Sequence, residues 1–91
     1  MTAETAPPVD ISVRYFGAAH AAAGADAEEL TMRTGATTVR DLVDELSRRN
    51  HDLAQVLLRC SYLCDGVAVH DKSQRLQPGN TIDVLPPFAG G

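Results

Sequence analysis

The apolar residues of this chain change their spacing along the sequence, and the change limits the folds that it can adopt. Between residues 9 and 15 every second residue is apolar, which is the pattern of a strand with one buried face. Between residues 39 and 46 the apolar residues recur three and four positions apart, on one face of a helix. The apolar positions of the two segments are Val9, Ile11, Val13 and Tyr15, then Val39, Leu42, Val43 and Leu46. Because each element buries only one face, we expect a sheet packed against a helix, in an α+β fold.

The N-terminal half of the chain is predicted to contain two strands and the main helix. Residues 28–32 alternate again, and their closeness to the first strand favours an antiparallel pair. Between these strands, the alanine-rich segment that starts at Gly17 allows one or two helical turns that stop at Gly24. The main helix is predicted over residues 38–49, capped by Thr37 or Thr38, with Asp41 in its first turn.

The C-terminal half is predicted to hold a shorter helix and the remaining strands. Residues 53–60 repeat the helical spacing, and Asp65-Gly66 is a favoured two-residue turn between strands at 62–64 and 67–69. A turn over residues 76–80 leads into the last strand, at 82–85. We therefore expect a disordered lead-in over residues 1–8, a folded domain over 9–85 with four to five strands on one main helix, and a flexible tail over 86–91.

Composition argues against several classes of function. The net charge is −4 and no run of Lys or Arg occurs, which argues against binding nucleic acid through a basic patch. No apolar stretch is long enough to span a membrane. Residues 1–8 lack the basic start and the apolar run of a secretory signal, so we expect a cytoplasmic protein.

The body of the domain offers little for catalysis. Cys60 and Cys64 are not expected to form a disulfide in the cytoplasm, and three scattered histidines do not complete the four ligands of a zinc site. The sequence has no Gly-rich phosphate loop and no Gly-x-Ser-x-Gly motif. We expect no metal and no cofactor in this chain, and two partly buried thiols.

The chemical group that stands out is the carboxylate at the end of the sequence, which closes Leu85-Pro86-Pro87-Phe88-Ala89-Gly90-Gly91. A terminal carboxylate can be activated as an acyl-adenylate, and Gly90 and Gly91 are slim enough to enter a narrow active-site channel. Pro86 and Pro87 stiffen the base of the tail in an extended form, and Phe88 adds an apolar anchor.

Three segments resemble the ubiquitin-like sulfur carriers, and most closely the small subunit of molybdopterin synthase. Residues 11–19, together with Gly24, are similar to that family's first strand and following helical turn, and the helix over 38–49 has the family's position. Residues 76–91 carry the specific part, since turn, strand, Pro-Pro, apolar residue, small residue and Gly-Gly follow in register. Two positions depart from the family: Leu63-Cys64 stands before the hairpin turn where Val-Asn is common, and Asn80 stands where Asp is usual.

The resemblance implies a β-grasp fold and a role as sulfur donor rather than catalysis by the chain alone. It implies that an ATP-dependent activating enzyme adenylates Gly91 and that a sulfur donor then converts Gly91 into 1-thioglycine, a thiocarboxylate. The tail would enter the large catalytic subunit of molybdopterin synthase, where its sulfur attacks cyclic pyranopterin monophosphate, in a heterotetramer of two small and two large subunits. The contacts with the partner would come from Pro86, Pro87, Phe88 and Ala89, and Gly90 would belong with Gly91 to the reacting end.

Three other functions are compatible with the same domain and the same Gly-Gly tail. A sulfur carrier for thiamin, cysteine or tRNA thiolation would follow the same steps as far as the thiocarboxylate. A ubiquitin-like modifier would form isopeptide bonds through Gly91, and an interaction module would leave the tail idle. The acceptor of the activated end separates these functions, and the sequence does not encode the acceptor.

Overall fold

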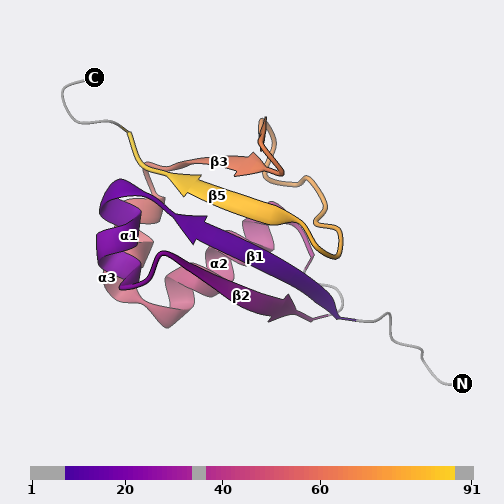
Figure 1. Cartoon of the computed structure of the whole chain (residues 1–91), viewed down its shortest axis with the longest axis horizontal. Helices are drawn as coiled ribbons and strands as arrows, with labels where there is room; N and C mark the ends of the chain where they lie inside the picture. Colours follow the sequence, from indigo (N-terminus) through magenta and orange to yellow (C-terminus); the bar gives the residue numbers. More distant parts are fainter. Residues whose placement is uncertain (1–7, 34–36, 88–91) are drawn as a thin grey trace, which may run out of the picture.

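The computed structural model describes residues 8–33 and 37–87 (Figure 1). In chain order the elements are β1 (Val9–Tyr15), α1 (Gly17–Ala23), β2 (Ala27–Met32), α2 (Val39–Arg49), α3 (His51–Leu57), β3 (Ser61–Cys64), β4 (Val67–Ala68) and β5 (Thr81–Leu85). The strands form one sheet in the order β2-β1-β5-β3-β4. The predicted lead-in falls almost entirely outside the described residues, as do positions 88–91 of the tail.

The sheet is mixed, because the first and last strands lie side by side and run parallel. β1 pairs with β2 in antiparallel register and with β5 in parallel register, with Val13 opposite Ile82. β5 also pairs with β3, antiparallel, with Tyr62 opposite Val84. The α+β prediction is confirmed, and so is the antiparallel pairing of the first two strands.

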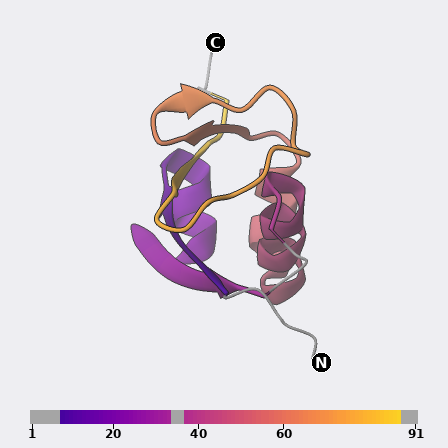
Figure 2. The same ribbon diagram turned by 90° about the vertical axis from the view of Figure 1, so that its right-hand side faces the viewer.

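All three helices pack on one face of the sheet, as the two views in Figures 1 and 2 show. The predicted main helix is α2, which buries Val39, Leu42 and Leu46. The two seven-residue helices add to the same core, α1 through Ala19 and α3 through Leu53 and Leu57. The sheet contributes its inward residues, which include Ile11, Val13, Ile82 and Val84, each no more than 1% exposed.

Side-chain caps fix where α2 and α3 begin. The hydroxyl of Thr38 accepts a hydrogen bond from the Asp41 amide (3.1 Å), and the Asp41 carboxylate accepts one from the Thr38 amide (3.1 Å). These hydrogen bonds hold the pKa of Asp41 below its usual value. Asn50 separates α2 from α3, since its side-chain oxygen accepts from the Leu53 amide and its amide nitrogen donates to the Ala22 carbonyl, both at 3.0 Å. Thr38 is therefore the cap, one of the two predicted.

The shorter second helix was predicted to reach residue 60, and the structure ends it at Leu57. The amides of Arg59 and Cys60 donate to carbonyls only three residues back, those of Val56 and Leu57. Such bonds tighten the chain into a turn and stop the helix. Cys60 therefore lies outside α3, directly before β3.

The predicted turns are confirmed. Gly24 adopts the left-handed conformation that ends α1, and its amide donates to the His20 carbonyl. Asp65 and Gly66 both have positive φ, 50° and 84°, as a tight hairpin between β3 and β4 requires. Within residues 8–33 and 37–87, no helix has the length and apolar character needed to cross a membrane.

Candidate functional site

The candidate site is the point where the tail leaves the sheet, at the end of β5. β5 pairs on both edges, with β1 and β3, and Ile82 and Val84 are fully buried in it. Pro86 follows directly and is half-buried, whereas Pro87 is exposed. The tail thus starts from the strand at the centre of the sheet, which is paired on both edges.

The junction between β1 and α1 lies against the start of the tail, at the end of β5 and Pro86. The Phe16 amide donates to the Val84 carbonyl (3.2 Å), which places this junction beside the end of β5. Gly17 has a positive φ of 54°, and a side chain at Gly17 would begin 3.7 Å from the ring of Pro86. Gly17 therefore gives the chain a conformation that favours glycine, whereas the distance to Pro86 would leave room for a Cβ.

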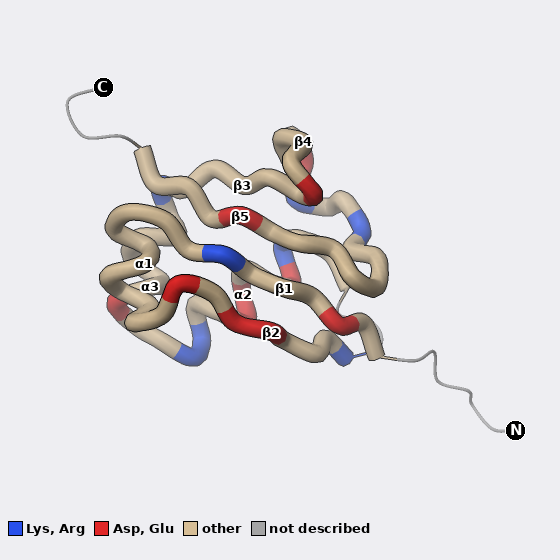
Figure 3. Tube along the Cα trace, in the orientation of Figure 1, with Lys and Arg blue, Asp and Glu red and all other residues tan. Residues whose placement is uncertain are grey.

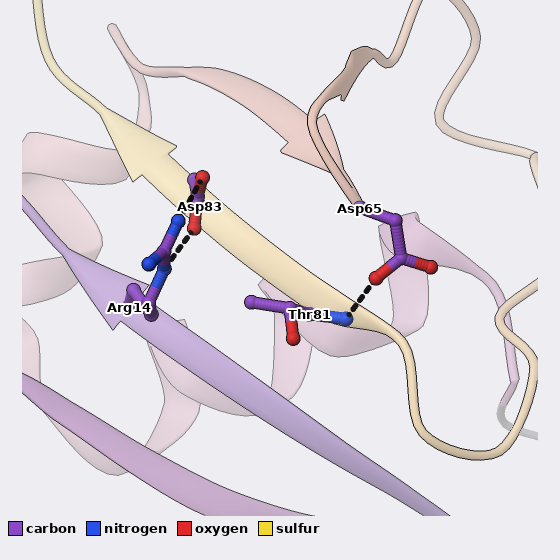
Figure 4. Close-up of polar contacts among 4 residues, drawn as sticks. All are labelled: Arg14, Asp65, Thr81 and Asp83. Atoms are coloured by element: carbon purple, nitrogen blue, oxygen red, sulfur yellow. Dashed lines mark hydrogen bonds and ion pairs between the residues drawn. The ribbon is translucent and has the colours of Figure 1, made fainter.

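An ion pair joins the two central strands on the sheet face opposite the helices. Arg14 Nε lies 2.6 Å from Asp83 Oδ1, and Arg14 Nη2 lies 2.9 Å from Asp83 Oδ2 (Figure 4). The Asp83 side chain is 8% exposed and that of Arg14 is 54% exposed. The hydrogen bond and the charge of Asp83 raise the pKa of Arg14, and the guanidinium also lies 5.7 Å from the centroid of the Phe16 ring. This bidentate pair fixes the register of β5 next to the tail.

The other end of β5 is held by the hairpin turn. Asp65 Oδ1 accepts a hydrogen bond from the Thr81 amide at 2.8 Å (Figure 4), and Asp65 Oδ2 accepts one from Asn80 Nδ2 at 2.6 Å. Asn80 Oδ1 in turn accepts from the Gln77 amide. Asn80, one of the two departures from the family pattern, thus links its own turn to the hairpin through an amide that can both donate and accept.

The sequence prediction missed the Arg14–Asp83 pair. The signal was the polar position of Arg14 in the alternating first strand, together with an acidic residue in an otherwise apolar last strand. Their contact depends on the parallel pairing of β1 with β5, which places Arg14 opposite Asp83. Alternation within single strands carries no information about that pairing.

Cys60 is partly buried, as expected, whereas Cys64 is more buried than expected. Cys60 is half-buried and donates from its thiol to the Val56 carbonyl (3.3 Å), and Cys64 is buried. Burial raises the pKa of both thiols, which keeps them protonated and weakly nucleophilic near neutral pH. No group of three or more potential ligands among His, Cys, Asp and Glu is found in the part of the chain that the structure describes.

Of the six predicted tail residues, the structure places only the two prolines. Phe88, Ala89, Gly90 and Gly91 lie outside the described residues. Pro86 and Pro87 lie together at the end of β5, where the sequence predicted the stiff base of the tail.

Comparison with known proteins agrees with this architecture. The ThiS family matches residues 13–91, which is most of the sequence. Comparison with curated proteins gives no significant match.

Solved structures share the fold over nearly the whole chain. A putative molybdopterin converting factor, subunit 1, from Pyrococcus furiosus is 25% identical, with a TM-score of 0.77 over 88% of this chain and 99% of that one. The small archaeal modifier protein 1 from Methanosarcina acetivorans is 19% identical, with a TM-score of 0.78 over 94% and 100% of the two chains. In a complex of subunits 1 and 2 of the molybdopterin-converting factor from Helicobacter pylori, the matching chain is 20% identical, with a TM-score of 0.67 over 91% and 100%.

The five-stranded mixed sheet with its helices on one face is the β-grasp, ubiquitin-like fold of these neighbours. With the family match over most of the sequence, this chain belongs to the ThiS family and is a ubiquitin-like sulfur carrier.

Proposed function

We propose that this chain is the sulfur carrier of molybdenum cofactor biosynthesis, acting in the cytoplasm. An ATP-dependent activating enzyme adenylates the carboxylate of Gly91, and a sulfur donor displaces AMP to leave a thiocarboxylate. The tail, which now carries sulfur, then enters the large catalytic subunit of molybdopterin synthase, where the sulfur attacks cyclic pyranopterin monophosphate. Two charged carriers supply the two sulfurs of the dithiolene.

The observation that carries the proposal is a Gly-Gly tail on the central strand of a ThiS-family domain. The prolines begin the tail at the end of β5, a strand held on both edges. The names of two structural neighbours support the molybdenum branch, since one is a putative subunit 1 of a molybdopterin converting factor and the other is a complex of subunits 1 and 2.

Each tail residue has a distinct role in the proposal. A carboxylate is a poor electrophile, so adenylation of Gly91 supplies the leaving group, and the thiocarboxylate then holds sulfur covalently as a nucleophile. Gly90 keeps the end slim enough for a channel. Phe88 and Ala89 contact the partner, and Pro86 and Pro87 hold the tail extended. The chain needs no cofactor of its own, because the activating enzyme uses the ATP.

Reconstitution of the sulfur transfer in vitro tests whether the carrier serves molybdenum cofactor biosynthesis or another pathway. Carrier charged by its own activating enzyme is mixed with the large subunit and cyclic pyranopterin monophosphate, and the pterin product is identified by mass spectrometry. We expect dithiolene formation with two carriers discharged per product. A charged carrier that leaves the pterin unchanged, yet supplies sulfur for thiazole, cysteine or tRNA thiolation, would contradict the molybdenum assignment.

A protein modifier is the second candidate, and the small archaeal modifier protein among the neighbours favours it. It predicts higher-mass conjugates on an immunoblot that disappear when Gly91 is deleted. Lys72 is the one lysine of the sequence, so chains of this protein linked through lysine would also disappear in Lys72→Arg. A blot that shows free carrier alone, from cells with a competent activating enzyme, would count against this candidate.

A further inference from the structure

The outer edge of β2 pairs with no strand that the structure describes. In the sheet, β2 is an end strand, and it bonds on its inner side to β1. Figure 1 shows β2 at the lower border of the sheet. The strand is six residues long and contains no proline. An edge of this kind offers a row of backbone N–H and C=O groups to another strand.

The register with β1 decides which backbone groups of β2 point outward. The Tyr15 amide donates to the Asp26 carbonyl at 2.9 Å, so this opposite pair is hydrogen-bonded, and every second pair along the two strands follows it. On its other edge, β1 donates from the Ser12 amide to the Asn80 carbonyl, toward β5. The residues of β2 that direct their amides and carbonyls outward are therefore those opposite the even positions of β1, namely Ala27, Glu29 and Thr31.

The polar side chains on the open face of β2 are held against their own domain. Ser12 Oγ donates to the carboxylate of Glu29 at 3.2 Å, and Thr31 Oγ1 donates to the carboxylate of Asp10 at 2.8 Å. Each bond joins residues that lie opposite each other on β1 and β2. Charged side chains often protect an edge strand by projecting past it, whereas these side chains turn back toward β1 and leave the backbone edge accessible.

The side chains on the helix face of β2 are also held inward. The carboxylate of Glu28 accepts hydrogen bonds from the Tyr15 hydroxyl (2.6 Å) and from Arg49 Nη2 (3.0 Å). Leu30 is partly buried against the core, and Met32 is 4% exposed. The edge is thus fixed in an extended form before a second strand arrives, which lowers the entropic cost of pairing.

Charge selects the strand that fits this edge. Arg33 follows β2, is exposed and takes part in none of the ion pairs among the described residues. If two copies of β2 pair in antiparallel direction with Thr31 on the two-fold axis, Glu29 of each copy lies opposite Arg33 of the other. Figure 3 shows acidic residues along β2, so a register that sets Glu29 opposite itself would oppose like charges.

We propose that β2 is the self-association edge of this protein, and that a second copy of the chain adds its own β2 in antiparallel register about Thr31. The two five-stranded sheets then become one continuous sheet. The same register sets Leu30 opposite Met32 of the second copy on the helix face. The proposal does not rest on the proposed function, because β1 separates β2 from β5, the strand that carries the tail.

Sedimentation equilibrium of the natural full-length chain measures the association directly. A pair of edge strands forms a small interface, so we expect a weak dimer with a dissociation constant of about 0.1 to 1 mM. A chain that stays monomeric up to about 1 mM would overturn the proposal.

Thr31→Pro tests the backbone edge, with Thr31→Val as its matched control. Both variants lose the hydroxyl that donates to Asp10, but only proline also removes an amide N–H that points outward. We expect Thr31→Val to dimerise like the natural chain and Thr31→Pro to dimerise at least about tenfold more weakly. If the two variants dimerise equally, the copies meet through another surface and the proposal is wrong.

A charge exchange tests the register. Glu29→Arg and Arg33→Glu should each weaken the dimer about tenfold, because each sets like charges opposite each other at two symmetric places. The double variant, Glu29→Arg with Arg33→Glu, restores opposite charges and should dimerise like the natural chain. A double variant as weak as the single ones would overturn the proposed pairing. This test uses exposed positions, so it holds even if Thr31→Pro fails to fold.

Two further measurements separate association from folding and from function. Thermal melting of each variant reports whether the domain is intact. Adenylation of Gly91 by the activating enzyme should be equal in the natural chain and the charge-exchange variants, since the tail starts two strands away from the altered edge. A monomeric natural chain that is adenylated would refute self-association and leave the sulfur-carrier proposal standing. A dimeric chain that is not adenylated would do the reverse.

Discussion

At the scale of single residues, the pair of Arg14 and Asp83 has the most specific position. It lies on the central strands, one residue before the buried Val84 and three before Pro86, so it stabilises the part of the sheet from which the tail leaves. The two partners are unequal. The side chain of Asp83 is nearly buried, whereas about half of the Arg14 side chain is exposed to solvent. Because an unpaired buried charge costs more than an unpaired exposed one, the two single substitutions should differ.

We expect Arg14→Ala to lower the free energy of unfolding more than Asp83→Ala, because only the first leaves a nearly buried carboxylate without its partner. The double substitution should be less destabilised than the sum of the two. Urea unfolding of the four proteins in a double-mutant cycle measures both differences. Equal and additive losses would show that the pair contributes no coupling.

At the scale of elements, the start of α2 was predicted well because its signals are local. Thr38 and Asp41 are three residues apart and bond to each other's backbone, and the apolar spacing that follows fixes the buried face. The same holds for the Asp65-Gly66 hairpin and for the end of α1 at Gly24. The predicted end of α3 was wrong by one turn. The amides of Arg59 and Cys60 donate to carbonyls three residues back, which ends the helix although the apolar spacing continues to Cys60.

The cap of α2 makes a prediction with a defined pH dependence. Thr38→Ala should lower the free energy of unfolding by about 1 kcal/mol at neutral pH. The pKa of Asp41 is held below its usual value of 3.8 in the folded chain, so its contribution is present above that value and is lost as the pH falls through the lower, folded pKa. The difference between the natural chain and the variant should therefore shrink below about pH 4.

Denaturant unfolding at pH 7 and at pH 3 measures this difference. A stability difference of the same size at both pH values would contradict the role given to the Asp41 carboxylate. Asp41→Asn is a useful companion, because it removes the titrating group while keeping a side chain that accepts a hydrogen bond.

At the scale of the whole molecule, the sequence predicted the class of fold, while the long-range contacts came only from the structure. Strand and helix positions follow from periodicity within short segments. The parallel contact of β1 with β5, the Arg14–Asp83 pair and the groove between α1, α3 and Pro86 join residues that are distant in sequence. No pattern within one segment reports such contacts, so the sequence predicted the tail and its two prolines but not the residues of the domain that surround them.

The separation between domain and tail predicts that stability and function can be uncoupled. Deleting Gly91, or extending the chain beyond it, should abolish sulfur transfer, since the reacting carboxylate is removed or displaced. The melting temperature should stay unchanged, because Val84 is the last buried residue of the part of the chain that the structure describes. Thermal denaturation and a sulfur-transfer assay on the same preparations check both halves. Full activity in a strain that carries the truncation would contradict the account.

The most direct test of the central claim is a mass spectrum of the C-terminal tryptic peptide, residues 76–91, from protein made together with its own activating enzyme. Intact mass is ambiguous, because exchange of oxygen for sulfur adds nearly the mass of one oxidation, but this peptide contains neither Met nor Cys. The sulfur-carrier account predicts a mass increase located on Gly91, the thiocarboxylate. Free acid alone, from cells in which the activating enzyme is shown to be competent, would contradict it.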